Sequence, residues 1–364
     1  MNSMPTIAMV AEHTRMPEHD LSLRAPHLTG LAAALSRAGH EVTLYVRRGQ
    51  GPAEQVAPDG FRIVRVTGRF RAGLADAMRA SRPDVVHAHC ASVWEAAAEV
   101  AAELDVPFVY GLHGASDLPS TRDHVAGAGV PAARAADHVV AAFSAQVRKL
   151  VTAGVPRHKI SVVPYGVDTD HFTPDGPATG AGRLPNRIVG LGELVPGSGF
   201  GTPVAALRAL PDTELLIVGG PRFGTHAREL RDYARSLGVA NRVHLAGPVP
   251  RTELPGLLRS ADLLVCSPWE PAFGIAALEA MACGVAVVAN RVGGLIDTVV
   301  DKVTGSHVTP RKPRELASVL NHLLHHKALC EQQGAAGRDR AWARYGWSRV
   351  VADTMRVYER AGLA

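Results

Sequence analysis

A chain of 364 residues is long for one compact core and comfortable for two domains of ordinary size. Its hydrophobic fraction of 46%, with 20% charged residues, is typical of a folded protein and excludes a disordered or fibrous one. No apolar run reaches the roughly 18 residues of a membrane-spanning helix, and the N-terminus lacks the basic segment of a secretory signal. We therefore expect a cytoplasmic protein.

The net charge of +5 is spread unevenly, about −1 up to residue 176 and about +6 after it, so we expect the second half to meet an anion. No basic stripe interleaved with aromatic residues is present, so a nucleic-acid partner is not expected. Peripheral contact with acidic lipid stays open but is not favoured. The four cysteines are far apart and form no CxxC pair, so we expect them to be reduced and buried. The sequence indicates no oligomeric state.

In the first half, short apolar runs alternate with segments of helical periodicity. The runs that predict strands are 5–10, 41–46, 61–66, 84–89, 107–112, 136–143 and 159–164. The segments that predict helices are 23–39, 69–81, 91–104 and 144–154. Strands that alternate with helices form a parallel sheet through right-handed crossovers. The pattern therefore predicts an α/β, doubly wound, Rossmann-like unit.

The same rhythm restarts in the second half of the chain. Strands are predicted at 186–192, 213–220, 242–247, 262–267 and 285–290, with helices at 227–238, 252–259, 275–283 and after Gly294. The stretch 165–185 between the halves is rich in Gly, Pro, Thr and Asp, which is typical of a linker. We therefore expect two Rossmann-like domains.

The segment 267–294 reads SPWEPAFGIAALEAMACGVAVVANRVGG. It resembles the donor-binding signature of the retaining glycosyltransferase family 4, whose architecture is called GT-B. This resemblance implies two Rossmann-like domains that face each other across a cleft. The expected domains are 1–175 together with a C-terminal helix at about 347–364, and 183–346, with nucleotide-sugar binding in the second. When the segment is aligned on Phe273 and Gly274, the family's first glutamate falls on Pro271, and Glu270 lies one residue early.

The resemblance assigns donor contacts to several residues. Glu279 matches the glutamate that binds the ribose hydroxyls, which suits a carboxylate because a cis-diol offers two hydrogen-bond donors. The alternative is a glutamate on a helix surface. Phe273, Gly274 and Ile275 fall where backbone N–H groups approach the sugar and diphosphate at a helix start, although Gly274 could equally serve the turn alone. We also assign donor contacts to Gly192, Glu193, Ser198, Gly220, Arg222 and Val249.

A second motif departs from the family pattern. The family carries an arginine and a lysine after the first strand of this domain, and both bind the diphosphate. In the stretch GLGELVPGSGF, Glu193 occupies the arginine position and Ser198 the lysine position. An anion in place of a cation repels a diphosphate. The candidates for replacement cations are Arg15, Arg24, Arg222 and Arg291.

In the first domain, the resemblance implies histidines near the transferred sugar or the acceptor. The candidates are His87 and His89, and His113 with Asp117 four residues later as a base or anchor. We assign acceptor-side roles to His87, His89, Arg15 and Arg24, and catalytic roles to His113, Asp117 and Glu270. A shared metal is not expected at His87 and His89, because side chains alternate between the faces of a strand.

The resemblance implies transfer of a hexosyl unit, with retention, from a UDP- or GDP-sugar to a small-molecule acceptor without a metal or other cofactor. An acceptor from secondary metabolism, such as antibiotic biosynthesis, would be consistent with the altered site. Two alternatives stay open. One is a pseudo-glycosyltransferase that binds a ligand or partner without sugar transfer, and the other is a GT-B epimerase or phosphorylase.

Overall fold

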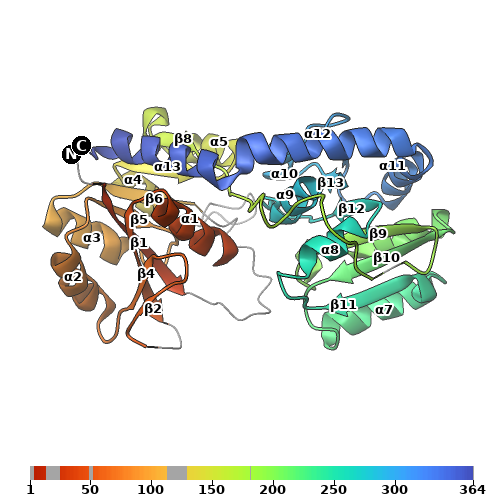
Figure 1. Cartoon of the computed structure of the whole chain (residues 1–364), viewed down its shortest axis with the longest axis horizontal. Helices are drawn as coiled ribbons and strands as arrows, with labels where there is room; N and C mark the ends of the chain where they lie inside the picture. Colours follow the sequence, from red (N-terminus) through yellow and green to blue (C-terminus); the bar gives the residue numbers. More distant parts are fainter. Residues whose placement is uncertain (1–3, 14–24, 49–51, 113–128, 181, 364) are drawn as a thin grey trace. The chain divides into compact units, whose positions relative to one another are not determined.

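The computed structural model describes residues 4–13, 25–48, 52–112, 129–180 and 182–363. The chain folds into two compact units (Figure 1). The first unit takes the described residues up to Gly166 and from Trp347 onward, and the second unit is Val167–Gly346. The boundary thus lies after Gly166, whereas the sequence placed it after residue 175.

The earlier boundary has a physical cause in the side chain of Phe172. Phe172 is 1% exposed and packs inside the second unit. The Arg259 guanidinium then holds the following chain, because it donates to the carbonyl oxygens of Thr173 at 2.9 Å and of Pro177 at 3.1 Å. The first part of the predicted linker is therefore packed structure of the second unit.

The sheet of the first unit has eight strands in the order β3-β4-β2-β1-β5-β6-β7-β8. Their bounds are β1 Thr6–His13, β2 Glu41–Arg48, β3 Glu54–Val56, β4 Arg62–Arg65, β5 Val85–Ala88, β6 Phe108–Gly111, β7 His138–Ala141 and β8 Ile160–Val162. All of these pairs are parallel except β3 with β4 at the edge. The helices are α1 Ala25–Arg37, α2 Phe70–Ser81, α3 Trp94–Leu104, α4 Gly129–Ala135, α5 Ser144–Thr152 and α13 Trp347–Ala361.

Two separate clusters of buried side chains cover the two faces of this sheet. One cluster joins α2, α3 and α5 to the sheet and includes Leu74, Val100 and Leu150. The other joins α1 and α13 and includes Leu35 and Tyr358. Cores on both faces are what a doubly wound parallel sheet requires. The predicted α/β class of this unit is confirmed.

The sheet of the second unit has six strands in the order β11-β10-β9-β12-β13-β14, all parallel. Their bounds are β9 Asn186–Leu191, β10 Thr213–Val218, β11 Val243–Gly247, β12 Leu263–Cys266, β13 Ala286–Asn290 and β14 Ser306–Val308. The helices are α6 Gly201–Ala206, α7 Thr225–Ser236, α8 Leu254–Arg259, α9 Ile275–Ala282, α10 Leu295–Thr298, α11 Pro313–His325 and α12 Lys327–Tyr345. The chain first builds outward from β9 to β11 and then returns to β12 on the other side of β9. Ligands in such sheets bind at this switch point, beyond the carboxyl ends of the strands.

Helix α9 lies in the interior of the second unit, and all eight of its residues are buried. Helix α12 lies against it, because a side chain added at Gly334 would collide with the carbonyl oxygen of Gly284, and one at Gly337 would reach Met281. The predicted helix from Ile275 is therefore confirmed, and its apolar sequence is explained by burial on all sides.

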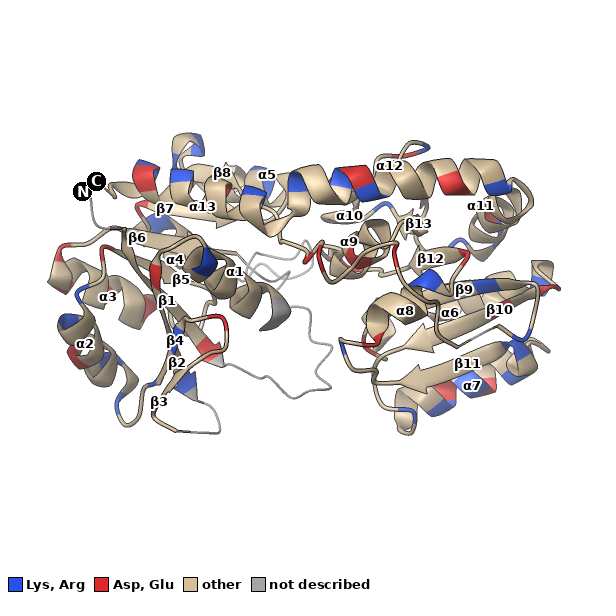
Figure 2. Cartoon of the chain, viewed as in Figure 1, with Lys and Arg blue, Asp and Glu red and all other residues tan. Residues whose placement is uncertain are grey.

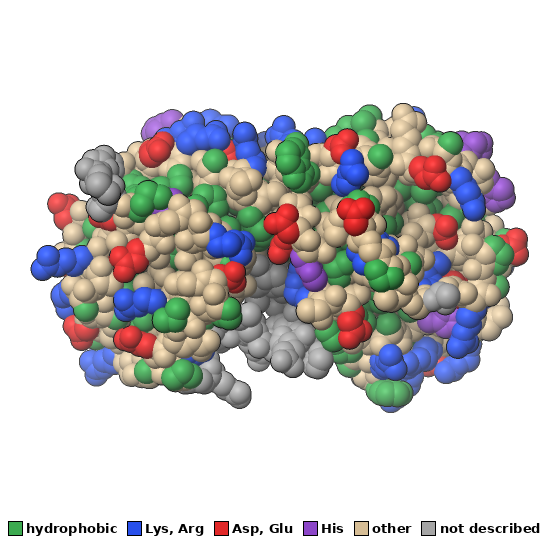
Figure 3. All heavy atoms as spheres, in the orientation of Figure 1, with side chains coloured by type: hydrophobic (Ala, Val, Ile, Leu, Met, Phe, Trp, Pro, Cys, Tyr) green, Lys and Arg blue, Asp and Glu red, His purple; other side chains and the backbone are tan. Residues whose placement is uncertain are grey.

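Acidic and basic side chains are interleaved on the surface. Figure 2 shows both signs along α7, whose sequence is THARELRDYARS, and Figure 3 shows both signs across the visible face of each unit. Within the described part of the chain, no helix combines the length and apolar composition needed to cross a membrane.

Candidate donor site

The loops after β9 and β12 meet beyond the carboxyl ends of these strands. The backbone N–H of Trp269 donates to the carbonyl oxygen of Gly197 at 2.9 Å. The Ser267 hydroxyl donates to the carbonyl oxygen of Ser198 at 3.3 Å. The two motifs that the sequence associates with the donor are therefore adjacent, although about seventy residues separate them.

Gly274 forms the turn into α9. Its φ of +94° belongs to the left-handed region, and an added Cβ would lie 2.5 Å from Leu295. Both facts require glycine at this position for the turn itself. No side chain among the described residues caps the start of α9. The first backbone N–H groups of the helix, beginning with Ile275, are therefore suited to an anionic ligand.

Phe273 serves the packing of this turn. Its ring is 9% exposed and lies edge-on to Tyr345 at 6.5 Å, and its carbonyl oxygen accepts from the Thr298 hydroxyl at 3.3 Å. The side chain therefore points into the interior, and the backbone is what this residue can offer a ligand.

Glu279 is 1% exposed at the middle of α9. The alternative of a helix-surface glutamate is therefore wrong. Its Oε1 accepts from Nη2 of Arg251 at 2.6 Å, whereas Oε2 has no hydrogen-bond partner among the described residues. Burial raises the pKa of Glu279, and the charges of Arg251 and His171 oppose that rise. A buried carboxylate with one oxygen unpaired is costly without a ligand, which marks a binding position.

Sequence reasoning missed Arg251 and His171. Arg251 lies in the turn between β11 and α8, and its guanidinium lies 5.3 Å from the centroid of the Phe172 ring. Nε2 of His171 donates to the carbonyl oxygen of Arg251 at 2.9 Å. No local pattern announces these contacts, because they join residues 28 and 80 positions apart in the chain. The only sign in the sequence of a role for Arg251 is that this basic residue directly follows the Val-Pro pair after β11.

Pro271 and Ala272, which follow Glu270, contact the glycine pair after β13. The N–H of Gly294 donates to the carbonyl oxygen of Ala272 at 2.8 Å. A Cβ at Gly293 would lie 2.8 Å from the backbone of Pro271, so glycine is needed for this contact. Glu270 itself is exposed, and its carboxylate lies 3.8 Å from where a Cβ on Gly197 would be. Glu270 therefore lies beside the loop that follows β9.

That loop has a hydrogen bond of its own where the family carries cations. The Ser198 hydroxyl donates to the carbonyl oxygen of Glu193 at 2.6 Å, and the Glu193 side chain is exposed. The assigned role of Ser198 as a diphosphate ligand therefore competes with a hydrogen bond inside the loop. Gly192 and Gly220 both have positive φ, and a Cβ on Gly220 would collide with Leu194.

Two of the candidate replacement cations are described. Nε of Arg222 donates to the carbonyl oxygen of Ala246, and the Arg222 carbonyl accepts from Arg231. Arg291 follows β13, is 61% exposed and lies 3.6 Å from Asp301. Val249 follows β11 and is partly buried. Arg291 is the less constrained of the two arginines.

In the first unit, the rings of His87 and His89 lie 3.9 Å apart on one side of β5, and both are buried. The sequence argument that strand alternation separates them is wrong, because residues two apart lie on the same face. Nδ1 of His87 lies 3.0 Å from the Tyr358 hydroxyl of α13, so His87 belongs to the core. The described residues include no group of three or more His, Cys, Asp or Glu side chains that could hold a metal ion.

Four assigned residues lie outside the described residues, namely His113, Asp117, Arg15 and Arg24. Their proposed catalytic and acceptor-side roles stay predictions from the sequence.

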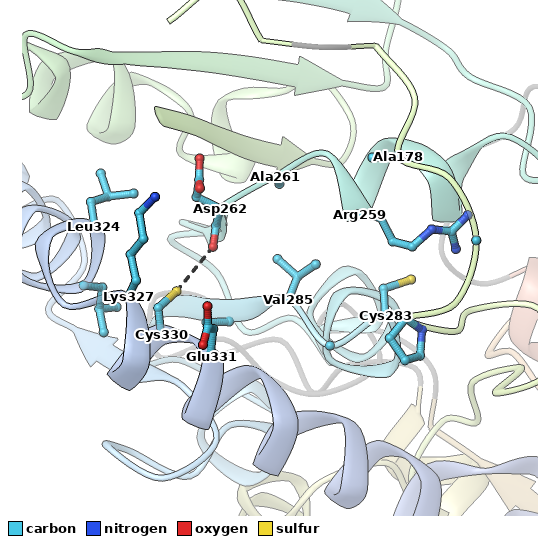
Figure 4. A pocket seen from close by; sticks show the side chains of 15 residues that line it. Ala178, Arg259, Ala261, Asp262, Cys283, Val285, Leu324, Lys327, Cys330 and Glu331 are labelled. Carbon is cyan, nitrogen blue, oxygen red and sulfur yellow. Dashed lines mark hydrogen bonds between the residues drawn. The ribbon is translucent and has the colours of Figure 1, made fainter. Parts of the chain in front are cut away.

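A pocket of about 450 Å³ lies in the second unit, away from these motifs (Figure 4). It lies at the starts of β12 and β13, where Asp262 and Val285 line it. Figure 4 also shows Cys330, whose thiol donates to the carbonyl oxygen of Asp262 at 3.4 Å. Because it lies at the opposite ends of the strands, this pocket is not the site that the motifs define.

Comparisons with known proteins agree with the doubly wound fold of the two units. The sequence model described as Glycosyltransferase Family 4 matches residues 25–171, and the one described as Glycosyl transferases group 1 matches residues 185–340. A D-inositol 3-phosphate glycosyltransferase of Xylanimonas cellulosilytica is 32% identical over 98% of this chain and 97% of its own. A glycogen synthase of Mycobacterium tuberculosis is 30% identical over 91% of this chain and 89% of its own.

Solved structures show the same fold. Sucrose-phosphate synthase from Thermosynechococcus elongatus superposes with a TM-score of 0.78 at 21% identity, covering 98% of each chain. Anabaena HepE in complex with UDP and glucose has a TM-score of 0.77 at 19% identity, covering 98% of this chain and 99% of its own. The fold is thus that of the GT-B glycosyltransferases. The chain belongs to glycosyltransferase family 4, the glycosyl transferases group 1, and is a glycosyltransferase.

Proposed function

We propose that this enzyme transfers a hexosyl unit from a nucleoside-diphosphate sugar, with retention, to a small acceptor that carries hydroxyl groups. The observation that carries the proposal is Glu279, a buried carboxylate with one oxygen unpaired among the described residues, close behind the uncapped start of α9. A carboxylate suits the ribose hydroxyls, and the helix start suits the diphosphate.

The comparisons support the classes of donor and acceptor. The relatives' names include a glycosyltransferase that acts on D-inositol 3-phosphate and a glycogen synthase, so we propose a cyclitol, a sugar or a similar polyol as acceptor. Anabaena HepE was solved with UDP and glucose, which supports a UDP-sugar first among the donors to be tested, with GDP-sugars second. No relative among these supports the antibiotic acceptor.

In the proposed reaction, the bond from the anomeric carbon to the diphosphate breaks while the acceptor oxygen attacks from the same face. The acceptor's proton passes to an oxygen of the leaving phosphate, so the products are the glycoside and the nucleoside diphosphate. Stabilising the leaving charge is the main task of such a site. The N–H groups at the start of α9 would contribute, together with a cation from another part of the chain, because Glu193 and Ser198 carry no positive charge.

Because Glu193 and Ser198 stand where the family has cations, there is one second candidate function. In it, the chain binds the donor but does not transfer the sugar. A panel of UDP- and GDP-hexoses, each incubated with inositol phosphates, free sugars and a glucan, distinguishes the two. Chromatography of the released nucleoside diphosphate is the readout, with Glu279→Gln as the control. Acceptor-dependent release by the wild type supports transfer. Donor binding without release from any pair would overturn transfer and support the binding protein.

A further inference from the structure

The pairing of Arg251 with Glu279 goes beyond what the family signature describes, and it deepens the proposed function on which it rests. We infer that Arg251 is a positioning residue, which takes Oε1 of Glu279 and leaves Oε2 as the acceptor for a ribose hydroxyl of the donor. Arg251 would thus act through the carboxylate and would not itself need to touch the nucleotide.

Arg251 holds the carboxyl group of Glu279 in one orientation. Nη2 of Arg251 lies 2.6 Å from Oε1, a short charge-assisted hydrogen bond that fixes the rotation of the carboxyl group. Oε2 is buried and has no partner in the described part of the chain. A hydroxyl that reaches Oε2 makes a hydrogen bond shielded from water, which strengthens it.

Arg251 is itself held in place by neighbouring residues. Its guanidinium lies 5.3 Å from the Phe172 centroid, and Phe172 is 1% exposed. Its carbonyl oxygen accepts from Nε2 of His171 at 2.9 Å. The backbone N–H of His171 in turn donates to Oδ1 of Asp168 at 3.0 Å. Because its backbone contact and the Phe172 ring fix the side chain of Arg251, Arg251 is suited to hold the carboxylate of Glu279 in one orientation.

Burial and nearby charges act on the ionisation of Glu279 in opposite directions. Burial raises its pKa, and the charge and hydrogen bond of Arg251 oppose that rise, as does His171. The other titratable or charged groups on the elements around α9 are Cys266 on β12, Cys283 after α9, Arg259 on α8 and Asp297 on α10. Helix α12 buries Gln333, Gly334, Gly337, Ala341 and Tyr345, of which only Tyr345 carries a titratable group, and its hydroxyl donates to the carbonyl oxygen of Asp297 at 3.2 Å. Arg251 is the group that both contacts the carboxylate and carries a permanent positive charge.

Nucleotide affinity should depend on pH through Glu279. A carboxylate accepts a ribose hydroxyl better than a carboxylic acid does, so nucleotide affinity rises with pH through the pKa of Glu279. Without Arg251 that pKa rises further, because the opposing charge is lost. The pH at which affinity reaches half of its plateau should therefore move upward in Arg251→Met.

The test is calorimetric titration of UDP and GDP into the full chain between pH 5.5 and 9. We expect Arg251→Met to bind the preferred nucleotide about tenfold more weakly at pH 7, which corresponds to a loss of about 1.4 kcal/mol, and to shift the midpoint upward. Arg251→Lys keeps the charge and should restore the midpoint. In Glu279→Gln the change of affinity with pH should be absent. This control separates ionisation of Glu279 from ionisation of the nucleotide's own phosphate, which would remain in the variant.

The matched control is Arg235→Met, which removes an arginine of α7 that pairs with Asp232 on the surface of the same unit. It should leave affinity and midpoint unchanged. If Arg251→Met fails to fold by circular dichroism, Arg251→Gln keeps a hydrogen-bond donor without charge and should shift the midpoint in the same direction.

The outcomes separate this inference from the proposed function. If the wild type binds neither UDP nor GDP, the proposed function fails and the inference fails with it. If the wild type binds one of them while Arg251→Met keeps the affinity and midpoint of the wild type, only the inference is overturned. Tighter binding by Arg251→Met would also overturn it, because Arg251 would then block the site.

Discussion

The backbone N–H of Trp269 donates to the carbonyl oxygen of Gly197 at 2.9 Å. Together with the hydrogen bond from Ser267 to Ser198, it joins the loop after β12 to the loop after β9, on the two sides of the point where the chain reverses its direction across the sheet. It places the displaced Glu270 next to the segment where Glu193 and Ser198 replace cations. The departures from the family pattern are therefore neighbours in space.

The joined loops depend on glycine at position 199. Gly199 has a φ of +70°, and an added Cβ would lie 1.9 Å from the carbonyl oxygen of Ser267. We expect Gly199→Ala to lower the free energy of unfolding by about 3 kcal/mol or more, because backbone strain and a collision with backbone add together. Urea unfolding followed by circular dichroism measures it.

Gly238 offers a matched control. It has the same φ of +70°, but a Cβ added there would meet nothing within 4 Å. Gly238→Ala should cost only the backbone strain, about 1 to 2 kcal/mol. Equal losses for the two variants would contradict the close packing of the loops.

A buried ion pair stabilises the second unit. Nε of Arg187 lies 2.7 Å from Oε1 of Glu214, and the two side chains are 10% and 1% exposed. Arg187→Met leaves the glutamate buried without this partner, so we expect a loss of about 3 to 5 kcal/mol in unfolding free energy. Replacing Glu214 by Leu in the same chain should recover part of that loss.

The exposed pair of Arg235 and Asp232 serves as comparison, since its side chains are 64% and 53% exposed. Arg235→Met should change the unfolding free energy by less than about 1 kcal/mol. If Arg187→Met lost no more unfolding free energy than Arg235→Met, the pair of Arg187 and Glu214 would not be buried in solution.

The cysteines should resist modification. Burial raises the pKa of Cys266 and of Cys283 to about 12 and that of Cys330 to about 11, and it also raises the pKa of Cys90. At pH 8 a thiol with a pKa of 12 is ionised about once in 10⁴ molecules, and the thiolate is the reactive form. Ellman's reagent should therefore react slowly with the native chain and titrate four thiols after unfolding. Cys266 and Cys283 are buried, whereas Cys90 and Cys330 are only partly buried, which departs from the expectation that all four are buried. A native thiol that reacts within seconds at Cys266 or Cys283 would contradict their burial.

Arg291 and Arg222 can be tested as the cation that replaces the family's arginine and lysine at the diphosphate. We expect Arg291→Ala to weaken UDP or GDP binding about tenfold, because its exposed side chain can turn to the diphosphate and a charge-assisted hydrogen bond contributes about 1.5 kcal/mol or more. Arg222→Ala should have little effect, because Arg222 is bound to the carbonyl oxygen of Ala246. Calorimetry compares them. Unchanged affinity in both would exclude these two arginines and turn attention to Arg15 and Arg24.

The fold could be predicted from the sequence because its signals are local. Apolar runs mark the strands, and the helix from Ile275 follows a glycine that needs a positive φ. The packing of the stretch 167–180 into the second unit could not be predicted, because its Gly, Pro and Asp content is that of a linker. Its place in the second unit depends on the burial of one side chain, Phe172.

The site was only partly predictable for a similar reason. Glu279 follows from its place in the motif, but its partner Arg251 comes from another loop, and tertiary structure alone brings them together. Ser198 shows the reverse case, because its position in the motif suggested a ligand, whereas its hydroxyl closes its own loop. The neighbouring rings of His87 and His89 follow from strand geometry once the spacing of two residues is read correctly.

The central claim is that Glu279 binds the nucleotide of a sugar donor, and it can be tested before an acceptor is known. Calorimetric titration of UDP and of GDP into the wild type and Glu279→Gln is the direct measurement. The account predicts that at least one nucleotide binds the wild type with a micromolar Kd and binds the variant at least tenfold more weakly. Equal binding by the two proteins, or no binding of either nucleotide to the wild type, would contradict it.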